Sequence, residues 1–279
     1  MQDDFMFWRN EMSLTKLLHH QIYFNKKTNS ASWVVLLHGI GGNSKIWFKQ
    51  LKQFRKHYHV IAIDLPGHYP NSTMEEWENE FSIEKCTDMI IDVLNEHQIE
   101  KAHFVGVSLG SVIIHQIVKR HKDRVNSAVL GGMILQFNLF SRFLIFAGHS
   151  LKKILPYMWL YQLFAHIMMP KNNHKQSRAM FITEAKKMHR VEFLRWFKLT
   201  RQVQETSENI EEYDVPRLYI SGSEDHLFIN ELKKNMVNDH FGELIEIDNC
   251  GHVCNVEKSE EFNFHALSFL GQFSNKKGA

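Results

Sequence analysis

The sequence predicts an α/β protein with a doubly wound, mostly parallel sheet and an inserted helical cap. Two observations predict this class. Short, continuous apolar runs typical of buried parallel strands alternate along the chain with segments of helical periodicity. One long stretch, residues 133–205, breaks the alternation because it carries helical patterns without a clear strand. A chain of 279 residues is long enough to bury such a core without disulfides or metals.

Six apolar runs are expected to form the parallel strands. They are Trp33–Leu37, Val60–Ile63, His103–Val105, Val125–Leu130, Arg217–Ile220 and Leu244–Ile247. Helical patterns lie at about Lys45–His57, Ser82–Gln98, Ser108–His121, Asn230–Asp239 and Glu257–Phe273. At the N-terminus, residues 21–26 fit an edge strand, and residues 1–18 fit an extra helix or a loose arm. Ligands of such sheets bind beyond the carboxyl ends of the strands, so we expect the functional site there.

Residues 133–205 are expected to fold as a separate cap over that edge, which leaves residues 1–132 and 206–279 for the core. Between Arg142 and Lys198 there are eleven lysines and arginines but only two acidic residues, Glu184 and Glu192. This local excess of +9 contrasts with +2 for the whole chain. We interpret it as a solvated face with a weak attraction for membrane surfaces. The apolar residues of the cap either pack on the core or line an acyl pocket, and the sequence does not decide which of them bind substrate.

The composition also indicates a compartment and narrows the partners. The overall charge is too balanced to indicate nucleic acid. Three cysteines, Cys86, Cys250 and Cys254, favour a reducing compartment over a disulfide framework, so we expect a cytoplasmic protein. We expect no signal peptide, because no basic segment followed by an apolar one opens the sequence. The apolar runs are too interrupted for a membrane span.

A glycine–serine–glycine element carries the strongest chemical signal. Gly106, Ser108 and Gly110 follow an apolar strand and open a helical pattern, which is the context of a nucleophile elbow. The sharp turn strains the serine backbone, and the small residues let the strand and helix pack closely. The alternative is a glycine-rich helix start with a solvated serine.

A serine needs a base and an orienting acid. His252 follows the last strand and Asp225 follows the fifth, in the chain order serine, acid, histidine. Asp225 could instead cap the following helix, and its neighbour Glu224 could compete for the acid role. For an oxyanion we expect two backbone N–H donors, that of Leu109 directly after the serine and that of Ile40 in the loop after the first buried strand.

With these motifs the sequence resembles the α/β-hydrolase superfamily, in particular its cap-bearing esterases, lipases and carbon–carbon hydrolases. The resemblance covers most of residues 33–270 and rests on HGIGG at 38–42, DLPGH at 64–68, GVSLG at 106–110, GSED at 222–225 and GH at 251–252. It implies Ser108 as nucleophile, Asp225 as acid, His252 as base, and Ile40 and Leu109 as oxyanion donors. It also implies that Asp64 and His68 fix a loop. Two departures could reshape the pocket: Tyr69-Pro70-Asn71 follows His68, so Ser72 comes one residue late, and Ser111 replaces a common glycine.

The sequence therefore predicts a carboxylesterase or lipase-like enzyme that acts on a small-molecule ester without a cofactor. The alternatives are carbon–carbon hydrolysis, thioester hydrolysis or acyl transfer on the same residues, and a ligand sensor without turnover. A metal at Cys250, His252 and Cys254 is disfavoured, because a fourth ligand at typical spacing is lacking. The chain is expected to be a monomer or a homodimer.

Overall fold

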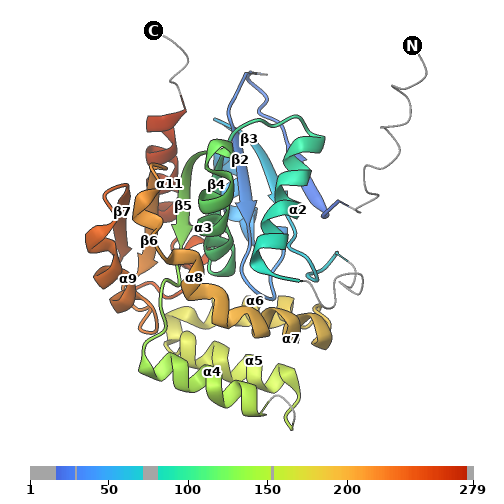
Figure 1. Cartoon of the computed structure of the whole chain (residues 1–279), viewed down its shortest axis with the longest axis vertical. Helices are drawn as coiled ribbons and strands as arrows, with labels where there is room; N and C mark the ends of the chain where they lie inside the picture. The colour runs from blue at the N-terminus through green and yellow to red at the C-terminus, as the bar shows by residue number, and fades with distance from the viewer. Residues whose placement is uncertain (1–16, 29, 72–80, 152–153, 275–279) are drawn as a thin grey trace, which may run out of the picture.

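The computed structural model describes residues 17–28, 30–71, 81–151 and 154–274. Its centre is a seven-stranded sheet in the order β1-β3-β2-β4-β5-β6-β7 (Figure 1). The strands are β1 (His20–Tyr23), β2 (Trp33–Leu37), β3 (His59–Ile63), β4 (Ala102–Val107), β5 (Val125–Gly131), β6 (Arg217–Gly222) and β7 (Gly242–Ile247). Only β1 pairs antiparallel, with β3, and the other five pairs are parallel. This confirms the predicted doubly wound, mostly parallel sheet.

The helices follow the strands in alternation on both sides of a central insertion. They are α1 (Phe48–Phe54), α2 (Ile83–Glu96), α3 (Leu109–His121), α4 (Leu139–Leu151), α5 (Tyr157–Met168), α6 (Lys175–Ala185), α7 (Arg190–Lys198), α8 (Val203–Ser207), α9 (Ile229–Asn235), α10 (Cys254–Glu257) and α11 (Ser259–Phe273). The prediction for residues 1–18 falls almost wholly outside the described residues, which begin at residue 17.

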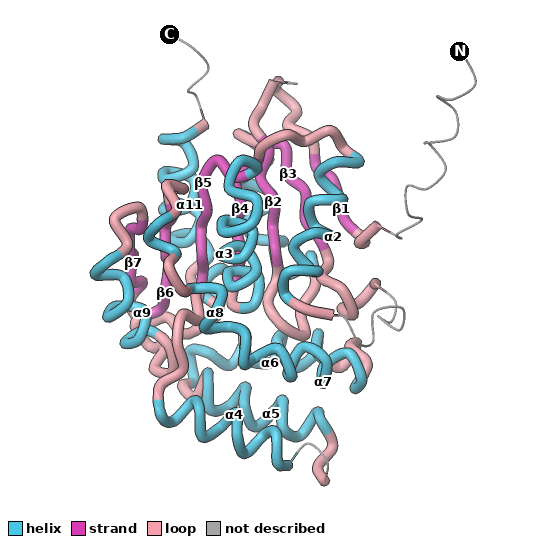
Figure 2. Tube along the Cα trace, viewed as in Figure 1, coloured by secondary structure: helices cyan, strands magenta, loops and turns pink. Residues whose placement is uncertain are grey.

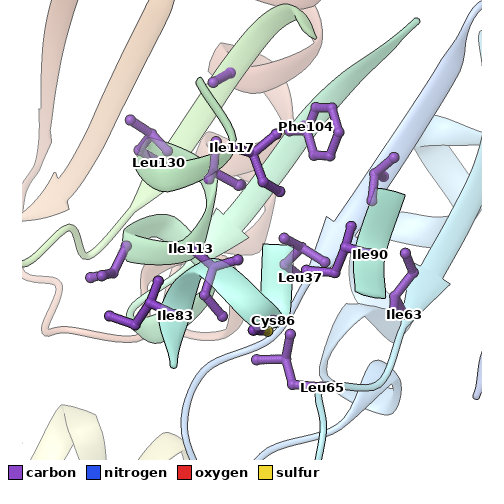
Figure 3. Close-up of a cluster of buried hydrophobic side chains, with 14 of the residues drawn as sticks. Leu37, Ile63, Leu65, Ile83, Cys86, Ile90, Phe104, Ile113, Ile117 and Leu130 are labelled. Atoms are coloured by element: carbon purple, nitrogen blue, oxygen red, sulfur yellow. The ribbon is translucent and has the colours of Figure 1, made fainter. Parts of the chain in front are cut away.

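Alternate residues of each strand point to opposite sides of the sheet, and in the central strands the residues on both sides are apolar. Val35 and Leu37 of β2 join a core with α2 and α3, whereas Val34 and Leu36 join a second core with α1 and α11. Figure 3 shows the first core, where Leu37 lies among side chains of α2 and α3. This two-sided burial explains why the strands appear in the sequence as continuous apolar runs.

Several helix ends differ from the sequence prediction for local reasons. A short 3₁₀ turn, Ser44–Trp47, precedes α1, and the side chain of Asn43 caps it by accepting from the Lys45 amide. Ser82 caps α2 in the same way by accepting from Lys85. The last predicted helix begins earlier and is divided into α10 and α11 at Lys258.

Between β5 and β6 the described residues form helices α4 to α8 and 3₁₀ turns. Figures 1 and 2 show α6 and α7 next to the carboxyl ends of the strands, with α4 and α5 farther from the sheet. Helix α8 runs across position 205, where the sequence analysis had placed the end of the cap. In the part of the chain that the structure describes, no helix has the length and apolar character needed to cross a membrane.

Candidate active site

Ser108 occupies the turn between β4 and α3. Its backbone has φ of 53°, a left-handed conformation that side chains other than glycine rarely adopt. The Ser108 amide donates to the carbonyl of Gly131 at 2.8 Å, which fixes the turn against β5. A Cβ built on Gly110 would lie 2.1 Å from the Leu37 carbonyl oxygen, and one on Gly106 would lie 2.6 Å from the Gly110 carbonyl carbon. The spacing in the sequence is therefore a steric requirement of this turn.

His252 lies between Ser108 and Asp225. Its Nε2 is 2.9 Å from Ser108 Oγ, and its Nδ1 is 2.8 Å from Asp225 Oδ2. His252 and Asp225 are both buried. Because a carboxylate only accepts, this network places the proton of the imidazole on Nδ1 and leaves Nε2 to accept from the serine hydroxyl. The structure thus brings together the three side chains that the sequence singled out, although they come from three separate loops.

The two acids after β6 have different partners. Asp225 is not the cap of the next helix, since α9 begins four residues later and its N-cap residue, Phe228, makes no side-chain cap bond. Glu224 bonds to Asn173, Lys171 and His174 in the segment between α5 and α6. The hydrogen bonds from Asn173 and Lys171 lower the pKa of Glu224 to about 2. Glu224 therefore lies in a partly buried ion-pair network with these three residues.

The glycine-rich loop after β2 closes on the serine from the other side. A Cβ built on Gly39 would lie 3.2 Å from Ser108 Cβ, so the backbone of this loop reaches van der Waals distance of the nucleophile position. Within the described residues, the amides of Ile40 and Leu109 donate to no protein acceptor. Two N–H groups beside a serine hydroxyl can bind an oxygen that develops negative charge there.

A tyrosine from the inserted helices holds this loop. The Tyr161 hydroxyl, on α5, donates to the carbonyl of Ile40 at 3.0 Å. The ring stacks on Phe181 with centroids 4.7 Å apart, and it is buried. Gly41 has φ of 71°, and a Cβ there would lie 2.5 Å from the Tyr161 hydroxyl oxygen. The loop thus needs glycine both for its conformation and for this contact.

The loop after β3 is anchored by its own polar side chains. Asp64 is buried and accepts from the amide and the hydroxyl of Ser44 and from His19. His68 is also buried and lies edge-on to Trp196 of α7, whose indole N–H donates to the Pro66 carbonyl at 2.8 Å. These contacts hold the loop and join it to the inserted helices.

The loop that carries His252 is also tied to the insertion. The Gly251 amide donates to Glu257 Oε2 at 2.6 Å, and the other oxygen of Glu257 accepts from Ser177 on α6. Cys250 and Cys254 beside His252 are buried free thiols, and burial raises the pKa of Cys254 to about 12. Across the described ranges, no cluster of three or more histidine, cysteine or acidic side chains is arranged to hold a metal ion.

Two cavities meet at Ser108. The larger, about 190 Å³, extends among α4, α5 and α7, and its walls are almost entirely apolar. The smaller, about 60 Å³, lies toward α6 and includes the charged side chains of Lys45 and Glu184. Ile40, Ser108 and His252 line both. A bound molecule bonded at the serine can therefore place an apolar group on one side and a more polar group on the other.

Sequence reasoning missed the residues through which the insertion supports the site. Tyr161 bonds to the loop of Ile40, Ser177 bonds to Glu257, and Trp196 bonds to the loop after β3, yet none of the three lies in a recognisable motif. Tyr161 and Ile40, which bond to each other, are 121 positions apart in the chain. No local pattern could have connected them.

Comparisons with known proteins agree with this architecture. A family model described as the alpha/beta hydrolase fold matches residues 32–158. The chain is 31% identical over 101 residues to an (E)-2-((N-methylformamido)methylene)succinate hydrolase of Acinetobacter baylyi, which is 36% of this chain and 37% of that protein. It is 32% identical over 96 residues to a pimeloyl-[acyl-carrier protein] methyl ester esterase of Aeromonas salmonicida, 34% of this chain and 35% of that protein. These matches span only about a third of either curated relative.

Solved structures extend the likeness over nearly the whole chain. An esterase from Exiguobacterium antarcticum superposes with a TM-score of 0.78 at 14% identity and covers 91% of this chain and 95% of its own. An enol-lactonase from Burkholderia xenovorans superposes with a TM-score of 0.70 at 18% identity and covers 91% of this chain and 96% of its own. At such identities the likeness concerns the fold alone.

Proposed function

We propose, on the premise that this chain is an α/β hydrolase by fold, that it is a serine hydrolase that cleaves carboxylic esters with an apolar acyl group. The single observation that carries the proposal is the continuous hydrogen-bonded row from Ser108 through His252 to Asp225, which opens into an apolar cavity. Such a row activates a hydroxyl that is otherwise a weak nucleophile.

The proposed reaction begins with acyl transfer to the serine. Ser108 Oγ attacks the ester carbonyl while His252 Nε2 takes the hydroxyl proton. The amides of Ile40 and Leu109 donate to the oxyanion of the tetrahedral intermediate. Collapse breaks the bond to the alcohol, which leaves with the proton from His252. Water then attacks the acyl-enzyme with His252 again as base, and the acid is released with Ser108 restored.

Asp225 supports both halves of this cycle. Its carboxylate accepts from Nδ1 of His252, fixes the tautomer with a free Nε2, and stabilises the imidazolium that forms in each step. The second oxygen of Asp225, Oδ1, is buried and has no protein partner in the described part of the chain. The two residues are completely enclosed, so their interaction is weakly screened.

The two cavities support an assignment of the two halves of the ester. The larger one has the volume and the apolar walls for an acyl chain, and the smaller one, with Lys45 and Glu184, suits the alcohol or a polar leaving group. We therefore propose aliphatic or aryl acyl esters, including lipid-derived ones, as the substrate class. No cofactor enters this reaction. The three free, buried cysteines support a cytoplasmic or otherwise reducing location as part of the proposal.

Hydrolysis of p-nitrophenyl esters from acetate to laurate tests both the role of Ser108 and the assignment of the larger cavity to the acyl chain. Wild type is expected to turn over several of them, with an optimum at one chain length, and Ser108→Ala is expected to be inactive. Ala147→Phe, which enlarges a cavity-lining side chain on α4, is expected to shift the optimum to shorter chains without loss on acetate.

Each outcome has a distinct meaning. Activity that persists in Ser108→Ala would remove the serine from the mechanism. An unchanged chain-length profile in Ala147→Phe would place the acyl chain elsewhere. No turnover of any ester would favour carbon–carbon or thioester substrates, acyl transfer, or a sensor that binds without turnover, since the same residues serve those roles.

A further inference from the structure

Helices α4 and α5 expose large apolar side chains on their outer surfaces. On α4, Leu139, Phe143 and Phe146 are exposed and recur at the spacing of one helix face. On α5, Trp159 and Leu163 are exposed and one turn apart, and Leu163 also borders the large cavity. We call these five residues the outer cap face. Figure 1 shows both helices at the end of the molecule farthest from the sheet strands.

The opposite sides of the same helices are also apolar. Leu144 and Ile145 of α4, with Leu160 and Phe164 of α5, line the large cavity that reaches Ser108. A helix that is apolar all round is normally buried on every side. Among the residues that the structure describes, only the inner side of these two helices is covered, so the outer side is available to contact an apolar surface outside the protein. Single exposed apolar residues are common, but a group on two neighbouring helices marks an interaction surface.

The charge of the surrounding sequence indicates which kind of apolar surface the outer cap face contacts. Residues 125–183, which include both helices, contain no aspartate or glutamate but six lysines and arginines. Arg142 is exposed on α4, between Leu139 and Phe143 of the outer cap face in the sequence. Apolar and aromatic side chains in a stretch of sequence whose charged residues are all basic are the composition that binds the interface of a bilayer with anionic headgroups.

We propose that the outer cap face docks on the surface of a lipid bilayer that contains anionic phospholipid. The phenylalanines, leucines and tryptophan enter the headgroup–acyl boundary, and the basic residues contact the phosphates. A second copy of this chain is the less suitable occupant, because two caps face to face would bring two groups of positive charge together. This proposal concerns binding only and does not depend on the reaction proposed above.

Sedimentation with large unilamellar vesicles tests the proposal. The vesicles are pure phosphatidylcholine, or phosphatidylcholine with a minority of phosphatidylglycerol. Wild type is expected to bind the second kind more strongly, and binding is expected to weaken as salt is added. The double variant Phe143→Ser/Phe146→Ser is expected to lose about tenfold in partition coefficient for each residue changed.

Phe264→Ser is the matched control. Phe264 on α11 is 67% exposed, close to the 63% of Phe143, but it belongs to another surface. This variant is expected to bind like wild type. A second measurement needs no substitution: amide exchange of α4 in wild type should slow when phosphatidylglycerol vesicles are added.

The opposite results would overturn the proposal. They are wild type that stays in the supernatant with both kinds of vesicle, a double variant that binds like wild type, or α4 exchange that vesicles do not change. A wild type that elutes as a dimer while the double variant elutes as a monomer, with no vesicle binding by either, would make the outer cap face a contact between copies instead.

Discussion

Tyr161→Phe removes one hydroxyl from the contact between α5 and the loop beside Ser108. The hydroxyl donates to the Ile40 carbonyl at 3.0 Å, while the ring remains stacked on Phe181. The substitution therefore leaves the packing in place and releases the loop that carries one proposed oxyanion donor. We expect kcat to fall and KM to stay nearly unchanged, because the donor acts mainly on the transition state.

The size of the effect follows from what is lost. Removal of an entire oxyanion donor costs about 10²- to 10³-fold in kcat. Here the Ile40 amide stays and only its position relaxes, so we expect a fall of about tenfold, or ~1.4 kcal/mol of transition-state stabilisation. The free energy of unfolding should fall by about 1 kcal/mol, the net worth of one hydrogen bond.

Tyr157→Phe provides the matched control. Tyr157 lies on the same helix, and its hydroxyl also donates to a backbone carbonyl, that of Met188, at 2.7 Å. That bond joins two residues that both lie between β5 and β6, so its loss should lower stability by a similar amount while kcat is preserved. Steady-state kinetics on the preferred p-nitrophenyl ester and urea unfolding would be measured for both variants. Equal kcat in the two variants, or an undiminished kcat in Tyr161→Phe, would refute the positioning role.

Two further predictions concern the strained serine and a buried histidine. Ser108→Gly should abolish turnover and raise the free energy of unfolding, measured in urea, by up to about 2 kcal/mol, because glycine tolerates the φ of 53°. Ser108→Ala should be inactive without this gain in stability. Equal stability of the two variants would argue against strain at this position. Burial, with the nearby Arg217, lowers the pKa of His115 to about 3, so the folded protein keeps this imidazole neutral while the unfolded chain protonates it below about pH 6.5. The stability contributed by His115 is thus complete above about pH 6.5 and is lost as the pH falls toward 3. When the pH is lowered from about 7.5 to about 5, the free energy of unfolding in urea should fall by about 2 kcal/mol more for wild type than for His115→Gln. An identical pH dependence of the two proteins would contradict this.

The parts of the molecule that the sequence predicted are those with a local cause. Strands β2, β3, β4 and β5 were recognisable because the sheet is buried on both faces there, which makes them nearly continuous apolar runs. The turn at Ser108 was recognisable because Gly106 and Gly110 are required by contacts within a few residues and with the adjacent strand. His252 and Asp225 could be chosen among many candidates because each follows a strand and because the chain order is serine, acid, histidine.

The features that the sequence did not predict either lack a clear local signal or depend on contacts between distant segments. The edge strand β1 is shorter than predicted and ends at Tyr23, before Asn25, whose side chain accepts from the Lys27 amide and turns the chain. The position of α8 across residue 205 has no sequence signal that separates it from the preceding helices. The link between Tyr161 and Ile40, and that between Glu257 and Ser177, exist only once the inserted helices pack on the core.

The polar links between the insertion and the core have a consequence for how such a protein diversifies. Three of these links involve α5, α6 and α7, through Tyr161, Ser177 and Trp196, whereas the inner side of α4 supplies small and apolar wall residues such as Ala147 and Gly148. Substitutions along that one wall can change what fits in the cavity without loosening the loops beside Ser108 and His252. Selection for a new substrate can therefore proceed by single steps in α4 that leave the reactive geometry unaltered.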